Sequence, residues 1–204
     1  MSARLTGLAG LAVLLFAWAG PLPGLVPRSF AAHMTLHMLV VGTAAPLLAV
    51  ALAPRLAITS ALALPIAVSL LDFLVVWGWH APALHHASRS MPLALMLEQA
   101  SFFGVSLLVW LVALSGRGLG NAALGGAMAL FFTSMHMTLL GALLGLAPRP
   151  LYAGHHGGHA ESWLGLSPLA DQQLGGVVML AIGGAVYLIG GLILLGRVLR
   201  RAPA

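Results

Sequence analysis

The chain has 204 residues, of which 60% are hydrophobic and only 6% are charged, a composition that excludes an ordinary soluble domain and predicts an all-α, polytopic membrane bundle. It contains no cysteine, which excludes disulfide bonds and thiolate metal sites. The formal net charge of +5 comes from nine arginines scattered over loops and chain ends, which is typical of membrane-topology signals and argues against binding to nucleic acid.

Six apolar segments follow one another along the chain, and most reach the roughly 20 residues needed to cross a bilayer. They run over 5–19, 30–53, 57–79, 93–114, 122–147 and 172–196. The first segment is short and follows Arg4, so it also fits a signal peptide, but we favour a retained helix. The sequence therefore predicts about six transmembrane helices in a single transmembrane domain over residues 1–204.

An even number of spans places both termini on one side of the membrane, and the arginines divide unequally between the two sides. The side of the termini collects Arg4, Arg55, Arg117, Arg197, Arg200 and Arg201, and the other side collects Arg28, Arg89 and Arg149. The positive-inside rule therefore favours cytoplasmic termini. The outer side then carries the loops that contain His80, His85, His86, His155, His156, His159 and Glu161.

The second apolar segment opens with two histidines and two methionines in an interleaved repeat: His33, Met34, His37 and Met38. Each pair is spaced i, i+4, which on a helix stacks both members on one face about 6 Å apart. Two imidazoles and two thioethers at the mouth of a membrane helix suit a soft metal such as Cu(I). The alternative for the histidines is that their rings reach headgroups or water at the interface.

Two outer loops add further histidines. His80 precedes Ala81-Pro82, so the third helix is expected to end there and His85 and His86 to follow in a loop. The tract His155-His156-Gly157-Gly158-His159 fits weak metal capture, or alternatively a solvated loop that is dispensable.

Three ionisable residues fall deeper inside the apolar segments, where a charge is costly and a functional role is the first hypothesis. Asp72 lies about two turns below the outer end of the third segment, Glu98 in the second turn of the fourth, and His136 in the middle of the fifth. The carboxylates either fasten the bundle by pairing with histidines or orient histidines that bind a metal. His136 is either a ligand or a core histidine satisfied by neighbouring hydroxyls.

Other residues are expected to shape the helices, and several common catalytic motifs are absent from the sequence. Pro46 and Pro65 lie inside apolar segments and are expected to kink the helices and free backbone carbonyls. The pairs Gly183-Gly184 and Gly190-Gly191 recur on one side of the last segment, which suits close helix packing. The chain has no HExxH, GxSxG, P-loop or dinucleotide-binding motif, so the sequence predicts no enzymatic activity.

Blocks of residues from about 30 to 185 resemble, in order, the caa3-type CtaG family of cytochrome c oxidase assembly factors. The blocks are His33-Met34-x-x-His37-Met38-Leu39 followed by Ala45-Pro46-Leu47-Leu48, then Trp79-His80-x-Pro82, then Leu97-Glu98 followed by Phe102-Phe103 and Trp110, then Pro150-Leu151-Tyr152, and finally Leu169-x-Asp171-Gln172-Gln173-x-Gly175-Gly176.

The resemblance implies a multi-span protein of the bacterial inner membrane that helps to mature a haem–copper oxidase, at the step that supplies copper. The matched positions single out His33, His37, His80, Glu98 and Asp171. The chain departs from the family in two ways. Gln99 stands where the family usually has a histidine, and six predicted spans replace the family's usual seven or so.

Taken together, these features predict an assembly factor that binds copper, as Cu(I), at an outer-facing cluster and delivers it to the copper-bearing oxidase subunit. The predicted ligands are His33 and His37 first, then His80 and His136, with Met34 and Met38 as soft ligands; Asp72, Glu98 and Asp171 orient them or balance their charge. Expected partners are that subunit, the bilayer, a periplasmic copper chaperone and a second copy of the chain. The alternatives are a transporter or channel for copper or protons, and a scaffold that docks oxidase subunits without a metal.

Overall fold

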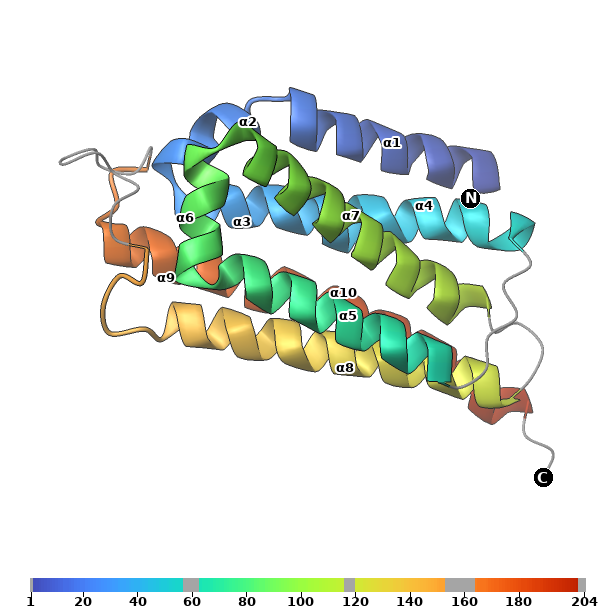
Figure 1. The fold of residues 1–204 in the computed structure, drawn as a ribbon. Coiled ribbons are helices and arrows are strands. Elements are labelled where there is room, and N and C mark those ends of the chain that lie inside the picture. The colour runs from blue at the N-terminus through green and yellow to red at the C-terminus, as the bar shows by residue number, and fades with distance from the viewer. Residues whose placement is uncertain (1, 57–62, 116–119, 153–163, 202–204) are drawn as a thin grey trace.

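The structure is a computed structural model that describes residues 2–56, 63–115, 120–152 and 164–201. Every element in those ranges is a helix, which confirms the predicted all-α class. The long helices lie side by side as a bundle, and α1 begins at the end of the bundle where α10 finishes (Figure 1). The short helix α6 crosses the opposite end, which we call the α6 end.

Several of the long helices are built from consecutive pieces. The elements are α1 (Ala3–Ala19), α2 (Leu22–Leu25), η1 (Val26–Arg28), α3 (Phe30–Leu39), η2 (Val40–Ala44), α4 (Ala45–Leu52), η3 (Ala53–Arg55), α5 (Ala63–His80), α6 (Pro82–Ser90), α7 (Pro92–Ser115), α8 (Gly120–Gly145), α9 (Pro168–Val178), η4 (Met179–Gly183) and α10 (Gly184–Arg201). Of the η elements, η1 and η3 are 3₁₀ turns, whereas η2 and η4 are π-helices.

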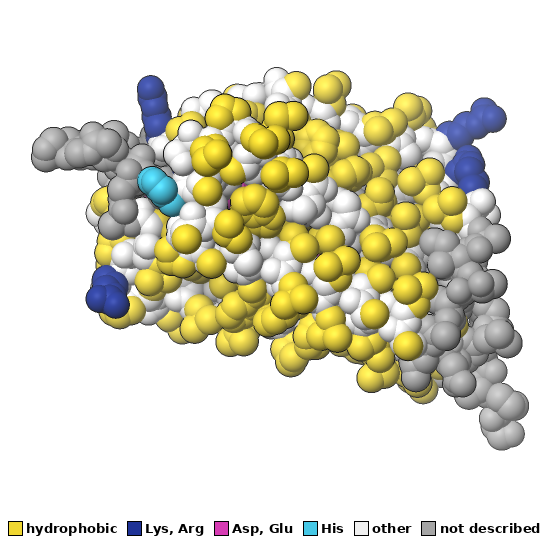
Figure 2. Space-filling view, in the orientation of Figure 1, with side chains coloured by type: hydrophobic (Ala, Val, Ile, Leu, Met, Phe, Trp, Pro, Cys, Tyr) yellow, Lys and Arg dark blue, Asp and Glu magenta, His cyan; other side chains and the backbone are white. Residues whose placement is uncertain are grey.

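Within the described residues, six helices are long and apolar enough to cross a membrane, which confirms the predicted number. They run over Ala3–Arg28, Phe30–Arg55, Ala63–His80, Pro92–Ser115, Ala122–Gly145 and Pro168–Arg200. Hydrophobic side chains cover the body of the molecule in Figure 2, and the arginines on this face lie towards its two ends. Residues 57–62, where the third predicted segment begins, lie outside the described part of the chain.

The span that carries the interleaved histidines and methionines is the most buried of the six. In its most apolar stretch, 67% of the residues are buried inside the bundle. Its first helix, α3, packs against α9, and its last, α4, packs against α1 and α7. Side chains on α3 therefore face neighbouring helices rather than lipid, which is where a polar group in a membrane protein must find its partners.

Pro46 frees a backbone carbonyl, as the sequence predicts, and the structure shows what satisfies it. Pro46 lies in the first turn of α4, directly after the π-helix η2, and has no N–H to offer the carbonyl five residues earlier. That carbonyl, of Val41, accepts hydrogen bonds from Ser106 Oγ at 3.0 Å and from Tyr187 Oη at 3.3 Å. Two neighbouring helices thus repair the break, as the interior of a membrane bundle requires.

Glycines allow close packing in the last span, which confirms the interpretation of its paired glycines. A Cβ added at Gly184 would lie 2.5 Å from Thr138 Oγ1, and one at Gly191 would lie 2.9 Å from the Phe131 ring. Both neighbours belong to α8, so the absence of side chains lets α8 and α10 approach each other closely.

The segment from 81 to 91, expected to be a loop, forms helix α6 instead. Pro82 occupies its first turn, where the missing N–H needs no partner and the fixed φ favours a helix. His85 and Ser88, spaced i, i+3, share the buried face of α6, and Arg89 beside Ser88 is also largely enclosed. Reading the proline only as a helix terminator missed that it also starts the next helix.

Candidate metal centre

Four buried histidines from three helices meet at the α6 end. His33 and His37 come from α3, His80 from the last residue of α5, and His85 from α6; we call them the histidine cluster. The ring centroids of His33 and His37 lie 4.2 Å apart, those of His33 and His85 5.1 Å, and those of His37 and His80 6.0 Å. The predicted stacking of the α3 pair is therefore present, and two further imidazoles close around it.

Asp171 fixes the start of the helix that carries His33 and His37. Its two carboxylate oxygens accept from Ser29 Oγ at 2.7 Å and from the backbone N–H of Phe30 at 2.6 Å. Ser29 in turn caps α3 by accepting from the N–H of Ala32 at 3.1 Å. A carboxylate at a helix N-terminus satisfies free N–H groups and interacts favourably with the helix dipole. Asp171 thus positions α3 one turn before His33.

The carbonyl of Val76 determines which nitrogen of His80 carries the proton. His80 Nδ1 lies 2.7 Å from that carbonyl, which can only accept, so Nδ1 is the donor. His80 Nε2 is left with a lone pair, is buried, and has no hydrogen-bond partner. Metal-binding histidines in proteins commonly use this arrangement, in which a backbone carbonyl holds the far nitrogen and orients the near one.

The nitrogens of the two α3 histidines are also without hydrogen-bond partners. Both ring nitrogens of His33 and both of His37 are buried and unbonded, which with His80 Nε2 makes five such atoms in three side chains. An unsatisfied buried polar group costs about 1–3 kcal/mol, and native proteins seldom keep one without a bound ion or water. Five in one place fit a site for an ion or for ordered water.

Aromatic rings wall the cluster. Phe102 lies edge-on to His37 at 4.1 Å, and Tyr152 lies 4.2 Å from the His85 ring. Tyr152 also stacks on Phe30 at 4.9 Å and donates from its hydroxyl to the backbone carbonyl of His80 at 2.8 Å. These contacts join α3, α5, α6 and the segment before α9 around the imidazoles.

Glu98 on α7 lies beside His33, with 4.0 Å between Oε1 and His33 Nε2. Ser88 Oγ donates to the same oxygen at 2.9 Å, and Gln99 Nε2 donates to Oε2 at 3.3 Å. Arg89 forms an ion pair with Oε2. Burial lowers the pKa of the Arg89 guanidinium and the Glu98 charge opposes that shift, so each charge of the pair compensates the other.

His33, His85 and Glu98 could hold a metal ion. Each offers one ligand atom, and the three atoms lie within 4.8 Å of one another. A tetrahedral ion with bonds near 2.1 Å needs ligand atoms about 3.4 Å apart, so small side-chain rotations would close the three around it. The small cavity of about 20 Å³ between His33, His85, Arg89 and Tyr152 has room for a single ion or water.

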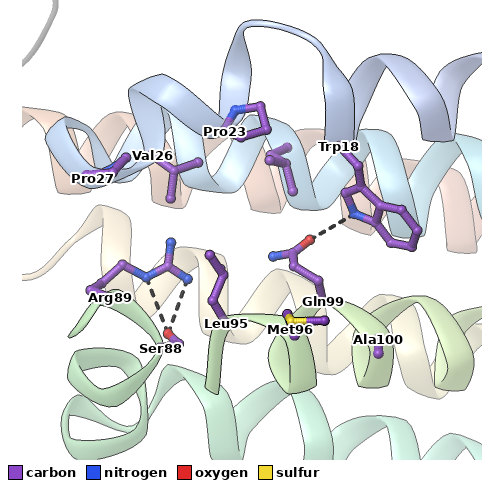
Figure 3. A pocket seen from close by; sticks show the side chains of 11 residues that line it. Trp18, Pro23, Val26, Pro27, Ser88, Arg89, Leu95, Met96, Gln99 and Ala100 are labelled. Atoms are coloured by element: carbon purple, nitrogen blue, oxygen red, sulfur yellow. Dashed lines mark hydrogen bonds between the residues drawn. The ribbon is translucent and has the colours of Figure 1, made fainter. Parts of the chain in front are cut away.

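An apolar cleft of about 430 Å³ flanks the site between α1, α2 and η1 on one wall and α6 and α7 on the other. In Figure 3, Trp18 Nε1 donates to Gln99 Oε1 across it at 3.2 Å, and Arg89 Nε and Nη2 donate to Ser88 Oγ at 3.3 and 3.2 Å. Gln99, Ser88 and Arg89 all contact Glu98 as well. These polar side chains therefore lie between the cleft and Glu98.

His136 lies elsewhere, in a pair with Asp72. His136 Nε2 is 3.1 Å from Asp72 Oδ2, and its nearest ring neighbours are Phe73 and Phe132, at 5.5 and 5.7 Å between centroids. Asp72 is eight residues before His80 on α5, which places the pair about 12 Å further into the bundle. The structure does not bring these two predicted site residues to the histidine cluster.

The remaining predicted residues divide as follows. Met34 and Met38 are buried on α3 beside the cluster, and Asp171 acts through the start of that helix.

Sequence reasoning did not select His85 or Arg89 as site residues, because the segment that carries them was expected to be a loop. The signal was present: Pro82 marks a helix start, and 85, 88 and 89 share the spacing of one helical face. Residues 155–161, which carry the other predicted loop histidines, lie outside the described part of the chain.

Comparison with known protein families gives one match, to the family described as cytochrome c oxidase caa3 assembly factor (Caa3_CtaG), over residues 5–201. No curated protein and no solved structure matches the chain significantly. The family match covers nearly the whole chain and includes every residue of the histidine cluster. It agrees with the resemblance drawn from the sequence blocks, and the chain therefore belongs to the Caa3_CtaG family of cytochrome c oxidase assembly factors.

Proposed function

We propose that this assembly factor receives copper at the α6 end, holds it in the histidine cluster, and passes it to the oxidase subunit that contains copper within the membrane. The family supplies the client, a cytochrome c oxidase under assembly. The cargo and the residues that hold it are our proposal.

One observation carries the proposal: five buried ring nitrogens of His33, His37 and His80 have no hydrogen-bond partner. A histidine that only fastens helices would pair its nitrogens with a carboxylate, a hydroxyl or a backbone carbonyl. His80 does so with Nδ1 alone and keeps Nε2 free. Neutral imidazoles with free lone pairs are good ligands for copper.

Copper would enter from the side of the membrane that the α6 end faces. The small cavity beside His33 is bounded there by Ser29, Pro150 and Tyr152, all close to helix ends. The division of arginines supports an orientation with this end outside and the termini in the cytoplasm of a bacterial inner membrane. A periplasmic copper chaperone would then be the donor.

The distribution of ionisable groups fits transfer of copper to the oxidase better than it fits conduction of ions through a channel. In the described part of the spans, the carboxylate and imidazole side chains lie between the α6 end and the Asp72–His136 pair. From that pair towards the ends that carry Arg55 and Arg197, no further such group follows among the described residues. A path for ions would need groups to replace their hydration over the full width.

A copper titration tests the proposal directly. The chain, purified without a histidine tag, would be titrated with Cu(I) against a competing chelator, as wild type and as His33→Ala/His37→Ala. We expect the double variant to lose at least 100-fold in affinity. Equal affinity in the two proteins would overturn the ligand assignment.

The neighbouring histidines of α6 provide a matched control, since His85 is buried in the cluster and His86 is exposed. His85→Ala should weaken copper binding, and His86→Ala should leave it unchanged. In cells that depend on the client oxidase, full oxidase activity with the His33→Ala/His37→Ala variant would favour instead a scaffold that docks subunits without a metal.

A further inference from the structure

A second small cavity lies beside His37 and His80 of the histidine cluster, and four of its nine lining residues are methionines. Its volume is about 10 Å³, enough for a single ion. Four buried methionines and two histidines of the cluster surround it: Met34, Met38, Met137, Met179, His37 and His80. We call this space the methionine chamber.

The chamber brings together residues from separate spans. Met34 and Met38 come from α3, Met137 from α8 and Met179 from the first residue of η4. Four thioethers from three spans meet at the level of His37, which is one helical turn, about 6 Å, below His33.

The backbone is unusual on both sides of the chamber. The π-helix η2 begins two residues after Met38, and the π-helix η4 begins at Met179 and ends at Gly183. The two π-helices also contact each other. Such segments are rare and are found frequently at functional sites.

Gly183 has no side chain, and this leaves room for the side chains of Met38 and Met137. A Cβ at this position would lie 3.3 Å from Met38 Sδ and 3.5 Å from Met137 Cβ. The glycine thus allows two methionines from different helices to share the chamber wall.

An ordinary apolar core also uses methionine, because its flexible side chain fills irregular gaps. The two histidines argue against that explanation here. His37 has two unbonded ring nitrogens and His80 has one, and both residues line the chamber. A purely apolar core would place no unsatisfied imidazole against its methionines.

We propose that the methionine chamber is an inner site that takes the cargo as Cu(I) from the outer site formed by His33, His85 and Glu98. Thioethers are soft, neutral ligands, which favour Cu(I) over Cu(II) or Zn(II). The ion passes by ligand exchange through His37 and His80, so it stays Cu(I) throughout and no electron is transferred. This inference rests on the proposed function and adds to it a second position for the cargo, with methionine sulfur among its ligands.

X-ray absorption of the copper-loaded full chain tests the inference. Cu(I) bound to the wild type should show both nitrogen and sulfur neighbours. The variant Met38→Leu/Met137→Leu, a volume-conserving change, should lose most of the sulfur signal and at least tenfold in affinity for Cu(I). The control Met128→Leu/Met135→Leu changes two methionines that are 48% and 62% exposed, and should behave as wild type.

A second variant guards against misfolding of the first. Gly183→Ala adds one methyl beside Met38 Sδ and should reduce the sulfur signal while nitrogen ligation remains. Copper bound through nitrogen or oxygen alone in the wild type would contradict the inner site and leave the proposed function standing. A sulfur signal in Met38→Leu/Met137→Leu equal to that of the wild type would do the same. A wild type that binds no copper would overturn both.

Discussion

The histidine cluster and the Asp72–His136 pair are both buried imidazole sites in one membrane bundle, yet their nitrogens are treated differently. His136 Nε2 has a carboxylate at 3.1 Å, whereas its Nδ1 is buried without a hydrogen-bond partner. His33 and His37 have no hydrogen-bond partner on any ring nitrogen. The carboxylate nearest to them, Glu98, is already shared with Arg89, Ser88 and Gln99. Burial is common to the two sites, so the contrast between them rests on the carboxylate that is hydrogen-bonded to His136.

The difference has opposite consequences for stability. Removing one member of a buried, paired set leaves the other uncompensated, which is strongly destabilising. Removing an imidazole that has no partner takes away an unsatisfied group, and an apolar replacement of similar shape can be neutral or stabilising. Mutations at the two sites should thus separate folding from copper binding.

The largest effect on stability is expected at the pair. Asp72→Leu or His136→Leu should each lower the free energy of unfolding by about 3–5 kcal/mol, because a buried partner is left alone. The double variant Asp72→Leu/His136→Leu should recover most of that loss, which unfolding in mild detergent would measure.

Copper affinity provides the control for these two single variants and the double variant. If the pair only fastens α5 to α8, variants that remain folded should bind copper as the wild type does. If His136→Leu instead lost copper affinity with unfolding unchanged, His136 would be a ligand, as the sequence predicted, and the contrast between the two sites would fail.

The cluster should show the reverse pattern. His33→Leu/His37→Leu removes four unbonded nitrogens and should change the free energy of unfolding by less than about 1 kcal/mol, while copper affinity falls at least 100-fold, equivalent to about 2.7 kcal/mol. Titration and unfolding on the same preparation check both parts. A large loss of stability would mean that the histidines hold the helices together and are not poised for a ligand.

How much of the fold and of the candidate site could be predicted from the sequence depends on how far apart in the chain the contacting residues lie. The six spans follow from runs of apolar residues, and the stacking of His33 on His37 follows from their spacing, so both were predicted. Glu98 was selected as an ionisable residue inside an apolar segment and Asp171 by resemblance. Their actual contacts, with Arg89 and with the start of α3, join helices that no local pattern connects.

The methionine chamber shows the same limit more sharply. Met34 and Met38 stand out because they interleave with histidines, whereas Met137 and Met179 come from other spans and carry no local signal. The π-helices that shape the chamber are equally hidden, since they interrupt the helical period for only five residues each. Arg89 was counted only as a topology signal, and the structure shows that it also pairs with Glu98.

Smaller effects on stability and copper affinity are expected at Asp171, which positions the histidine cluster through the start of α3. Asp171→Ala removes two hydrogen bonds and a charge at the start of α3, and should lower the free energy of unfolding by about 2 kcal/mol. Copper affinity should fall by about tenfold because α3 carries His33 and His37. Asp171→Asn keeps one acceptor and should give an intermediate result. Lost copper affinity with unchanged unfolding would instead place Asp171 among the ligands.

The smallest effect is expected at Tyr152, which donates a hydrogen bond to the backbone carbonyl of His80. Tyr152→Phe removes the 2.8 Å hydrogen bond to the His80 carbonyl and keeps the stacking on Phe30. Stability should fall by about 1 kcal/mol, and copper affinity should stay within about threefold of wild type. Tyr152→Ala also loses the stacking and should reduce both further. A large loss of copper affinity in Tyr152→Phe would show that the hydroxyl, and not only the imidazoles, takes part in holding the ion.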